Sequence, residues 1–281
     1  CAGGVRCDGN FTVSEETFEK EGLKITLSGL MGGHSGTEIH KGHLNGIIAL
    51  CKLLEGEEFC LSDIRGGSAD NAIPSFCEAT VYAENEDEFI KSLKEKFDTL
   101  KAEKEKAEPY MELRTEKTDI KTIISKEDTA RAISTIASLP DGVIAYSKNI
   151  EGLVETSLNL GVISKKDGNI ITGHSLRSSV GEEKEKLKAV LSSHYKKAKA
   201  KHSFHSDYPA WEYKEQSRLQ EVFKKCYKAQ TGNNLKISAI HAGLECGLFT
   251  KKAPYLDCIS FGPDMQAIHS TKEKLSVSSS E

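Results

Sequence analysis

Apolar residues alternate with polar ones in some stretches of the chain and recur at helical spacing in others. In LKITLSGL, Leu23, Ile25 and Leu27 alternate, which is typical of a strand with one buried face. A glycine-rich loop over 29–36 comes next, and the apolar residues of LNGIIALCKLL then repeat at helical spacing. The pattern predicts a strand, a glycine loop and a helix over 43–54. A phosphate-binding loop is excluded here, because the glycines lack the GxGxxG order and no Gly-Lys-Ser/Thr follows.

Further elements follow from the same periodicities as far as residue 213. Ser125 and Asp128 have the spacing of a capping box, which predicts the start of a helix. Lys-Asp-Gly at 166–168 separates two alternating stretches, as in a β-hairpin. The predicted elements are a strand over 76–83, a charged surface helix over 86–106, a helix over 125–139, hairpin strands over 153–163 and 169–178, a helix over 182–200 and a strand over 203–213. Helices that cover one face of an antiparallel sheet predict an α+β domain over 21–213.

The pattern changes after residue 213. A helix is predicted over 217–230, and the short apolar stretches LKISAI and LDCISFG are predicted to be strands. Short apolar strands separated by helices indicate the edge of an α/β sheet. We therefore expect residues 1–20 and 214–281 to belong to a second domain that is only partly present.

Composition and charge narrow the function classes. The 281 residues suffice for one or two buried cores, and 38 basic against 42 acidic residues leave a net charge of −4. The lack of a basic surplus excludes a nucleic-acid binder, and no apolar run is long enough to span a membrane. The eight cysteines include no CxxC pair, which favours the reduced thiols of a cytoplasmic protein. The chain starts at Cys1 without a visible signal peptide, and we expect it to be a fragment.

Four segments concentrate histidine, glycine and polar residues: GGHSG (32–36), SADNAIP (68–74), HAGLECG (241–247) and FGPDMQAIHS (261–270). Loops at the carboxyl ends of strands are where α/β sheets bind ligands. His269 follows a predicted buried strand, where an imidazole can ligate a metal ion, although a solvated side chain is the more common role of such a histidine.

Three other residues each have a chemical and a structural interpretation. Arg177, at the end of a hairpin strand, has a planar guanidinium that suits a carboxylate, but a surface ion pair would also explain it. His34 lies between glycines, which let a ligand approach closely, or it is a turn residue that tolerates unusual dihedral angles. Glu245 has the simpler interpretation of a carboxylate at a helix end. The residues alone leave these alternatives open.

Taken together, these motifs resemble the aminoacyl-histidine dipeptidases. The resemblance rests on LKITLSGLMGGHSGTEIHKGHLN, GGSADNAIP, GLVETSLNLGV, IHAGLECGLF, and the FGP and HSTKE segments near the C-terminus. The family consists of cytosolic dinuclear-zinc dipeptidases related to carnosinase, succinyl-diaminopimelate desuccinylase and carboxypeptidase G. The resemblance implies an α+β lid and dimerisation domain of β-α-β-β-α-β type over 21–213. This domain would be inserted in an α/β zinc-peptidase catalytic domain, of which 1–20 and 214–281 are parts.

The resemblance also implies roles for single residues. His269 matches the family's last metal ligand. His34 matches the lid histidine that reaches the active site of the other subunit in a homodimer, where it stabilises the oxyanion. The implied substrate-binding residues are Arg177, which would hold the substrate carboxylate, together with Asn71, Glu245 and Gly247. The implied cofactor is a pair of zinc ions in each active site, with cobalt or manganese as possible substitutes.

The family's HxD metal motif, bridging aspartate and adjacent glutamates are missing from the chain, and His205-Ser206-Asp207 matches HxD in letters only. One metal ligand cannot hold two zinc ions, so we expect the chain alone to be inactive. The complete protein is expected to hydrolyse dipeptides such as aminoacyl-histidine. Two alternatives stay open: another hydrolase of the superfamily (a tripeptidase, aminoacylase or desuccinylase), and a non-catalytic fragment that dimerises through its lid. A two-fold contact is expected through strand 23–30 and helix 43–54.

Overall fold

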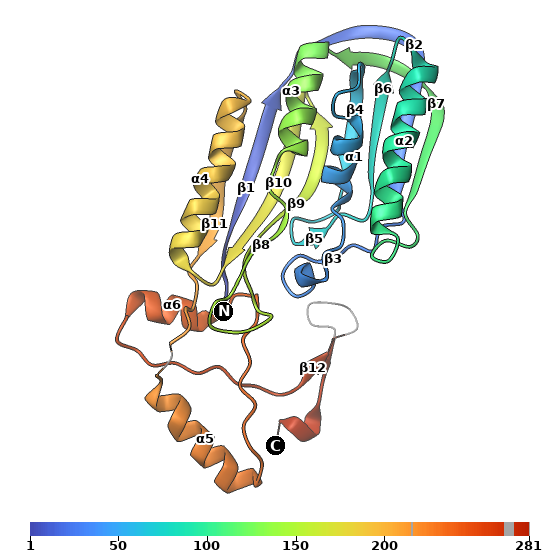
Figure 1. The fold of residues 1–281 in the computed structure, drawn as a ribbon. Coiled ribbons are helices and arrows are strands. Elements are labelled where there is room, and N and C mark those ends of the chain that lie inside the picture. Colours follow the sequence, from blue (N-terminus) through green and yellow to red (C-terminus); the bar gives the residue numbers. More distant parts are fainter. Residues whose placement is uncertain (215, 267–272, 281) are drawn as a thin grey trace.

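The computed structural model describes residues 1–214, 216–266 and 273–280 of the chain. Figure 1 shows two regions, a layered one of sheet and helices and, below it, one in which loops predominate. We call the first the sheet region (1–208) and the second the C-terminal region (214–280). The sheet region ends with β11 (Lys201–Tyr208).

One antiparallel sheet organises the sheet region. In the described part of the chain it has nine strands, in the order β11-β1-β10-β9-β4-β6-β2-β7, with β8 paired to β9. The other strands of this sheet are β1 (Gly3–Thr12), β2 (Glu15–Ser28), β4 (Cys60–Gly66), β6 (Cys77–Tyr82), β7 (Glu112–Ile124), β8 (Gly142–Tyr146), β9 (Val154–Lys166) and β10 (Asn169–Ser178). The predicted α+β class is confirmed.

Helices cover one face of this sheet (Figure 1). They are α1 (Gly46–Leu54), α2 (Glu86–Lys104), α3 (Lys126–Ala137) and α4 (Gly181–Lys197). One side chain from each, namely Leu50, Leu93, Ile136 and Leu191, is completely buried in a single apolar core. The amphipathic patterns therefore place each helix on the sheet through burial of its apolar face.

Two local signals in the sequence are confirmed. The Ser125 hydroxyl oxygen accepts a hydrogen bond from the backbone N–H of Asp128 at 3.2 Å, so the predicted cap starts α3. The β9–β10 hairpin turns at Asp167 and Gly168, whose φ angles of 48° and 68° lie in the left-handed region. Residues close in sequence decide both features.

The sheet begins before the predicted boundary at residue 21. β1 lies inside it, with Gly3–Thr12 paired to β10 and Gly4–Asn10 paired to β11. β7, which was not predicted, pairs with β2 from Glu15 to Ser28. Residues 1–20 therefore share a sheet with 21–208, because the pairing of β1 with strands far along the chain is invisible to local periodicity.

The predicted dimer contact is wrong for helix 43–54 and stays a prediction for strand 23–30. Every residue of α1 except Lys52 is buried within the chain. β2 lies between β6 and β7, so its backbone groups are already paired on both sides. α1 therefore offers no free face and β2 no free edge to a second subunit, but the face of β2 with Lys24, Thr26 and Ser28 is half-exposed, and a homodimer stays a prediction.

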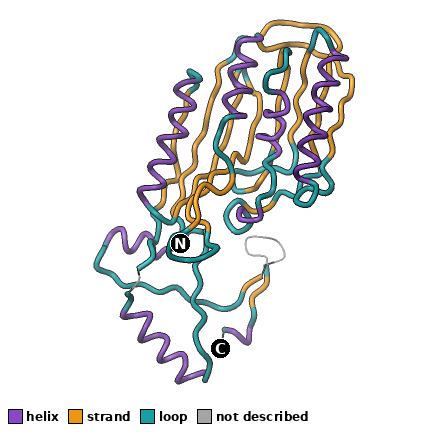
Figure 2. The backbone as a smooth tube through the Cα atoms, viewed as in Figure 1, coloured by secondary structure: helices purple, strands orange, loops and turns teal. Residues whose placement is uncertain are grey.

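The C-terminal region contains α5 (Arg218–Thr231), which confirms the helix predicted over 217–230, and α6 (Glu245–Lys252). Its described strands are only β12 (Met265–Gln266) and β13 (Lys274–Leu275), and a short 3-10 helix, η2, spans Val277–Ser279. The strands predicted at LKISAI and LDCISFG are wrong, since both stretches run as loops (Figure 2). Neither has a neighbouring strand among the described residues to pair its backbone groups. In the portion described, no helix is long and apolar enough to cross a bilayer.

Candidate functional site

A row of residues crosses four strands near the end of the sheet that faces the C-terminal region. Ser157 on β9 pairs with Arg177 on β10, Arg177 pairs with Gly4 on β1, and Gly4 pairs with Tyr208 on β11. Residues directly opposite one another in antiparallel strands point to the same face of the sheet. The register therefore gathers a hydroxyl, a guanidinium and a phenol on one face.

Arg177 is fixed at one end of its guanidinium. Its Nη1 donates a hydrogen bond to the hydroxyl of Tyr208 at 3.1 Å. Gly4 lies between the two side chains, and a Cβ there would overlap the Tyr208 hydroxyl. The Nε of Arg177 is buried, and no described residue accepts a hydrogen bond from it. A half-buried cation whose buried Nε–H has no partner among the described residues suits an anion.

His241, the first residue of HAGLECG, completes this row. Its Nε2 is hydrogen-bonded to the Ser157 hydroxyl at 2.7 Å, and both residues are buried. Burial first, then the positive charge of Arg177, lowers the pKa of His241 to about 4. The imidazole is therefore neutral at pH 7, and it adds no second positive charge beside Arg177.

The glycines of HAGLECG let this loop pack closely on the end of β11. A Cβ at Gly243 would lie 2.6 Å from the Tyr208 ring, and one at Gly247 would lie 2.8 Å from the Pro209 carbonyl oxygen. Glu245 is the first residue of α6 and is exposed, as its structural interpretation predicts. Gly247 thus has a packing role, while no described contact ties Glu245 to Arg177.

The GGHSG loop holds the His34 ring in one tautomer. Its Nδ1 accepts hydrogen bonds from the backbone N–H groups of Gly36 and Thr37, both at 3.1 Å. A ring nitrogen that accepts such bonds carries no proton, so the neutral imidazole bears its proton on Nε2. Gly32 and Gly33 have φ angles of 62° and 128°, which other residues rarely adopt. The glycines thus shape a loop that fixes the orientation of this imidazole.

Asn71 lies next to this loop. Two short strands, β3 (Gly33–His34) and β5 (Ala72–Ile73), pair here, and the Asn71 carbonyl accepts a hydrogen bond from the Ser35 N–H at 2.9 Å. The Asn71 side chain is exposed. The structure therefore places Asn71 beside the loop that carries His34.

Buried polar side chains anchor these two loops. Asn159 on β9 donates from its Nδ2 to the carbonyls of Asp70 and Ala72, at 3.0 and 2.8 Å. The buried Glu108 carboxylate accepts hydrogen bonds from the N–H groups of Met31 and Leu44, at 2.7 and 2.8 Å. The second anchor brackets the segment that contains GGHSG and the short 3-10 helix η1 (Ile39–Lys41). Both loops are therefore held at several points by the sheet region.

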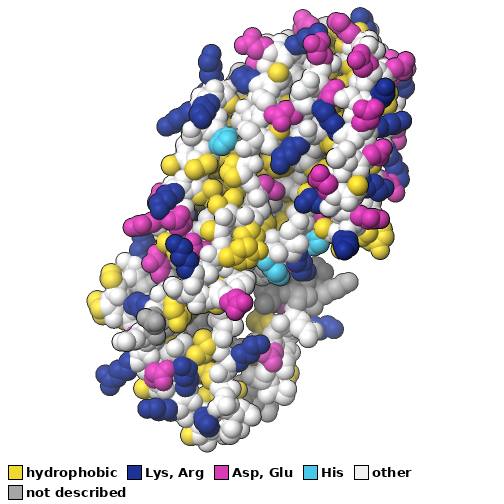
Figure 3. Space-filling view, in the orientation of Figure 1, with side chains coloured by type: hydrophobic (Ala, Val, Ile, Leu, Met, Phe, Trp, Pro, Cys, Tyr) yellow, Lys and Arg dark blue, Asp and Glu magenta, His cyan; other side chains and the backbone are white. Residues whose placement is uncertain are grey.

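The loops that carry His34 and Asn71 meet the row of Ser157, Arg177 and Tyr208 at His241. A Cβ at Gly36 would lie 3.1 Å from the His241 carbonyl oxygen of the same chain. β9 links both groups, because Ser157 bonds His241 while Asn159 holds the loop of Asp70. Figure 3 shows histidine side chains at the surface where the two regions meet.

Sequence reasoning missed four residues of this arrangement, namely Ser157, Asn159, Tyr208 and His241. A signal existed for the first two, since the polar residues of ETSLN alternate along a predicted strand. The lone histidine of HAGLECG was a second signal. Tyr208 had none, because only the register of β10, β1 and β11 brings it to Arg177.

The described residues do not fit a metal site by themselves. Within them, no three histidine, cysteine, aspartate or glutamate side chains are close enough to share an ion. His269, the predicted ligand, lies outside the described residues. A zinc pair would need ligands from beyond the part of the chain described, and no chemical step through zinc can be derived from it.

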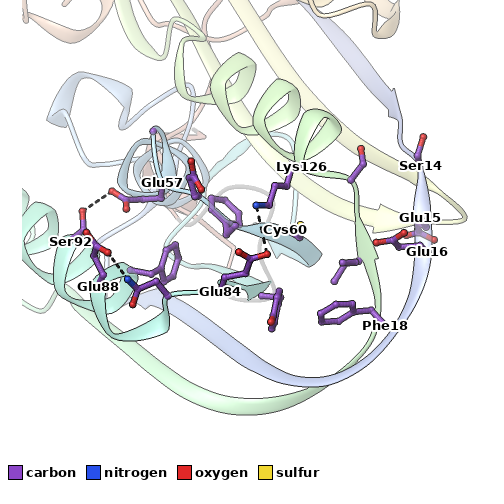
Figure 4. A pocket seen from close by; sticks show the side chains of 18 residues that line it. Ser14, Glu15, Glu16, Phe18, Glu57, Cys60, Glu84, Glu88, Ser92 and Lys126 are labelled. Carbon is purple, nitrogen blue, oxygen red and sulfur yellow. Dashed lines mark hydrogen bonds and ion pairs between the residues drawn. The ribbon is translucent and has the colours of Figure 1, made fainter.

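A cavity of about 760 Å³ lies at the other end of the sheet (Figure 4). It is lined by residues next to the far end of β1, including Ser14, and by several glutamates, with Lys126 4.0 Å from Glu84. β1 separates this cavity from Gly4 and thus from Arg177. The cavity and the candidate site are therefore distinct.

Comparison with known proteins confirms the predicted resemblance. The chain is 36% identical over 291 aligned positions to the cytosol non-specific dipeptidase of Escherichia coli (strain K12). It also matches the crystal structure of aminoacylhistidine dipeptidase from Vibrio alginolyticus, with a TM-score of 0.88 and 32% identity. Each match covers 99% of this chain but 59% of the relative, so the chain spans about three fifths of their length. No protein-family model matches the chain.

Proposed function

We propose that this chain forms the lid and part of the catalytic domain of a cytoplasmic zinc dipeptidase. The complete protein, meaning this chain together with the part that its relatives carry outside the match, would hydrolyse dipeptides such as aminoacyl-histidine. The observation that carries the proposal is the half-buried Arg177, whose buried Nε has no partner among the described residues, in a chain similar to two dipeptidases over 99% of its length.

Arg177 would bind the carboxylate of the dipeptide. Two parallel N–H donors of a guanidinium match the two oxygens of a carboxylate, and burial strengthens this charged contact. With His241 neutral, the charge that attracts a carboxylate at this end of the row comes from the guanidinium and not from the imidazole. A fixed distance from this arginine to the reacting bond would limit the substrates to dipeptides. Asn71, Glu245 and Gly247 are proposed to line the rest of the substrate site.

His34 would stabilise the reacting carbonyl. During hydrolysis a water oxygen adds to the peptide carbon, and the carbonyl oxygen becomes an anion. A neutral imidazole with its proton on Nε2 can donate a hydrogen bond to that oxygen without first losing a proton. This tautomer supports the oxyanion role that the resemblance implies.

His34 is proposed to serve the active site of the second subunit in a homodimer formed through the lid. The closeness of Gly36 to the His241 carbonyl of the same chain supports the opposite arrangement, in which His34 serves its own subunit. The two arrangements differ in whether inactive subunits can complement each other, and this is a measurable difference.

Zinc is the proposed metal, two ions per active site, with cobalt or manganese as substitutes. His269 would supply one ligand and the remaining ligands would come from outside this chain. We therefore expect the 281-residue chain alone to retain no zinc pair and to hydrolyse no alanyl-histidine. Metal analysis after dialysis and a hydrolysis assay test this expectation, and two retained zinc ions with turnover would contradict it.

A panel of substrates on the complete protein tests the proposed function. Dipeptides with a free carboxylate should be hydrolysed, whereas tripeptides, acylated amino acids and succinylated substrates should react far more slowly. A preference for one of these other classes would favour a different hydrolase of the superfamily. Absence of all hydrolysis with bound metal would favour a non-catalytic, dimerising protein.

A further inference from the structure

The contact between Arg177 and Tyr208 spans an entire strand. The two residues sit on β10 and β11, and β1 lies between these strands. Adjacent strands are about 4.8 Å apart, so side chains two strands away from each other meet only if both are long and the residue between them is small. Gly4 is that residue, and a methyl group in its place would overlap the Tyr208 hydroxyl.

Tyr208 is itself held from two further directions. Its ring packs on the backbone of Gly243, where a Cβ would approach to 2.6 Å. Its carbonyl oxygen accepts a hydrogen bond from Nζ of Lys184 at 3.0 Å, and this lysine of α4 is buried and also bonds Asp207. The phenol is therefore fixed before it contacts the guanidinium.

We propose that Tyr208 is the positioning residue of Arg177. Its hydroxyl accepts the Nη1 hydrogen bond and so turns the guanidinium until the Nε edge is left for the substrate carboxylate. This inference rests on the proposed function, because it assumes that Arg177 binds a carboxylate. Holding the guanidinium in place before binding removes the conformational cost of ordering the long arginine side chain when the ligand arrives.

The alternative is that the phenol merely fills space between Gly4 and Gly243. The two explanations differ in what the hydroxyl does. Tyr208→Phe keeps the ring and removes only the acceptor, so a packing role leaves Arg177 unchanged. Gly4→Ala tests the same contact without altering either partner. Tyr110→Phe is the matched control, since Tyr110 is 71% exposed.

Arginine Nε–Hε signals in nuclear magnetic resonance provide the readout on the 281-residue chain, which has six arginines. Relaxation of the Arg177 signal reports the mobility of its guanidinium without any ligand. Titration of the complete protein, stripped of metal so that it cannot turn over, with alanyl-histidine and with its carboxamide, alanyl-histidinamide, then reports carboxylate binding. Backbone amide spectra show whether each variant keeps its fold.

We expect a rigid Arg177 Nε in the parent protein and in Tyr110→Phe, and a mobile one in Tyr208→Phe and Gly4→Ala. The dissociation constant for alanyl-histidine should rise about tenfold in Tyr208→Phe, the usual effect of losing one hydrogen bond to a charged group. Unchanged mobility and affinity in a folded Tyr208→Phe protein would overturn the proposal. If alanyl-histidine fails to shift the Arg177 signal even in the parent protein, the carboxylate role itself fails, while the mobility comparison still decides whether Tyr208 holds the guanidinium.

Discussion

The sheet region and the C-terminal region use amphipathic helices in different ways. In α1 every residue but Lys52 is buried, whereas none of the residues of α5 is buried. Leu219 and Val222 of α5 are 40% and 48% exposed, although the helix has apolar residues at helical spacing. The sheet region thus completes its own core, while α5 of the C-terminal region leaves its apolar side chains in contact with solvent.

The site lies where these two regions join. HAGLECG belongs to the C-terminal region, yet it also contacts Ser157 and Tyr208 of the sheet region. The sheet therefore orders the HAGLECG part of the C-terminal region, whose His241 lies beside Arg177. Stability should depend on the sheet region, and the geometry of the site should depend on the junction.

The largest expected effect is the difference in lost stability between a substitution in the sheet region and one in the C-terminal region. Leu50→Ala removes a completely buried side chain and should lower the free energy of unfolding by about 2–5 kcal/mol. Phe261→Ala removes a side chain that is 74% exposed and should change it by less than about 0.5 kcal/mol. Denaturant unfolding followed by circular dichroism measures both. Equal losses would show that the C-terminal region shares the core.

The second effect concerns turnover by the complete protein. His34→Ala removes an oxyanion donor and should lower kcat by about 10²–10³ while the metal content stays the same. His269→Ala should lose metal and activity together. Metal analysis and steady-state kinetics on the same samples distinguish these two outcomes.

Mixed dimers of the two histidine variants test whether His34 acts across the interface. If it does, a dimer of one His34→Ala and one His269→Ala subunit keeps one site with intact metal ligands and an intact donor. Activity should then exceed the sum of the separate variants. No gain in dimers shown to have formed would place His34 at the site of its own subunit.

A smaller effect should come from pH at the junction. The pKa of His241 is about 4 while the HAGLECG loop is packed on the sheet, and it takes the ordinary value of 6.5 when this loop is released. Between these values the released loop binds one more proton, so acid favours release. Attachment of the loop should weaken by up to about 3 kcal/mol as the pH falls from 6.5 to 4. Hydrogen exchange at Ala242 and Gly243 measures this, and a His241→Gln variant with the same pH dependence would contradict it.

The smallest expected effect is that of the Ser157 hydroxyl. Ser157→Ala removes one partner of the buried bond to His241 and should weaken attachment of the loop by about 1–3 kcal/mol near neutral pH. Ser157→Thr, which keeps a hydroxyl, is the control. Exchange rates at 242–247 should rise in the alanine variant alone, and an equal rise in both variants would point to packing instead.

The limits of prediction from the sequence follow from the range of each interaction. The cap at Ser125 and the turn at Asp167 depend on adjacent residues, and both are predicted correctly. β7 is missed because its charged residues hide the alternation of an edge strand. The apolar stretch LKISAI is mistaken for a strand, because its composition carries no information about whether a partner strand is present.

In the candidate site, too, contacts between residues distant in sequence escape prediction. The motifs propose His34, Asn71 and Arg177 as site residues one by one, through resemblance. They do not reveal that Arg177 meets Tyr208 over Gly4, because that contact needs the register of strands that are distant in sequence. They also overlook His241, whose role depends on burial against Ser157.

The most direct test of the proposed function compares kcat/KM of the complete protein for alanyl-histidine and alanyl-histidinamide, before and after Arg177→Lys. Lysine keeps the positive charge but loses the planar pair of donors. We predict that kcat/KM for the free acid falls about 10²-fold, while that for the amide changes by less than about threefold. An equal loss with both substrates, or no loss with either, would contradict the assignment of Arg177 as the group that holds the dipeptide carboxylate.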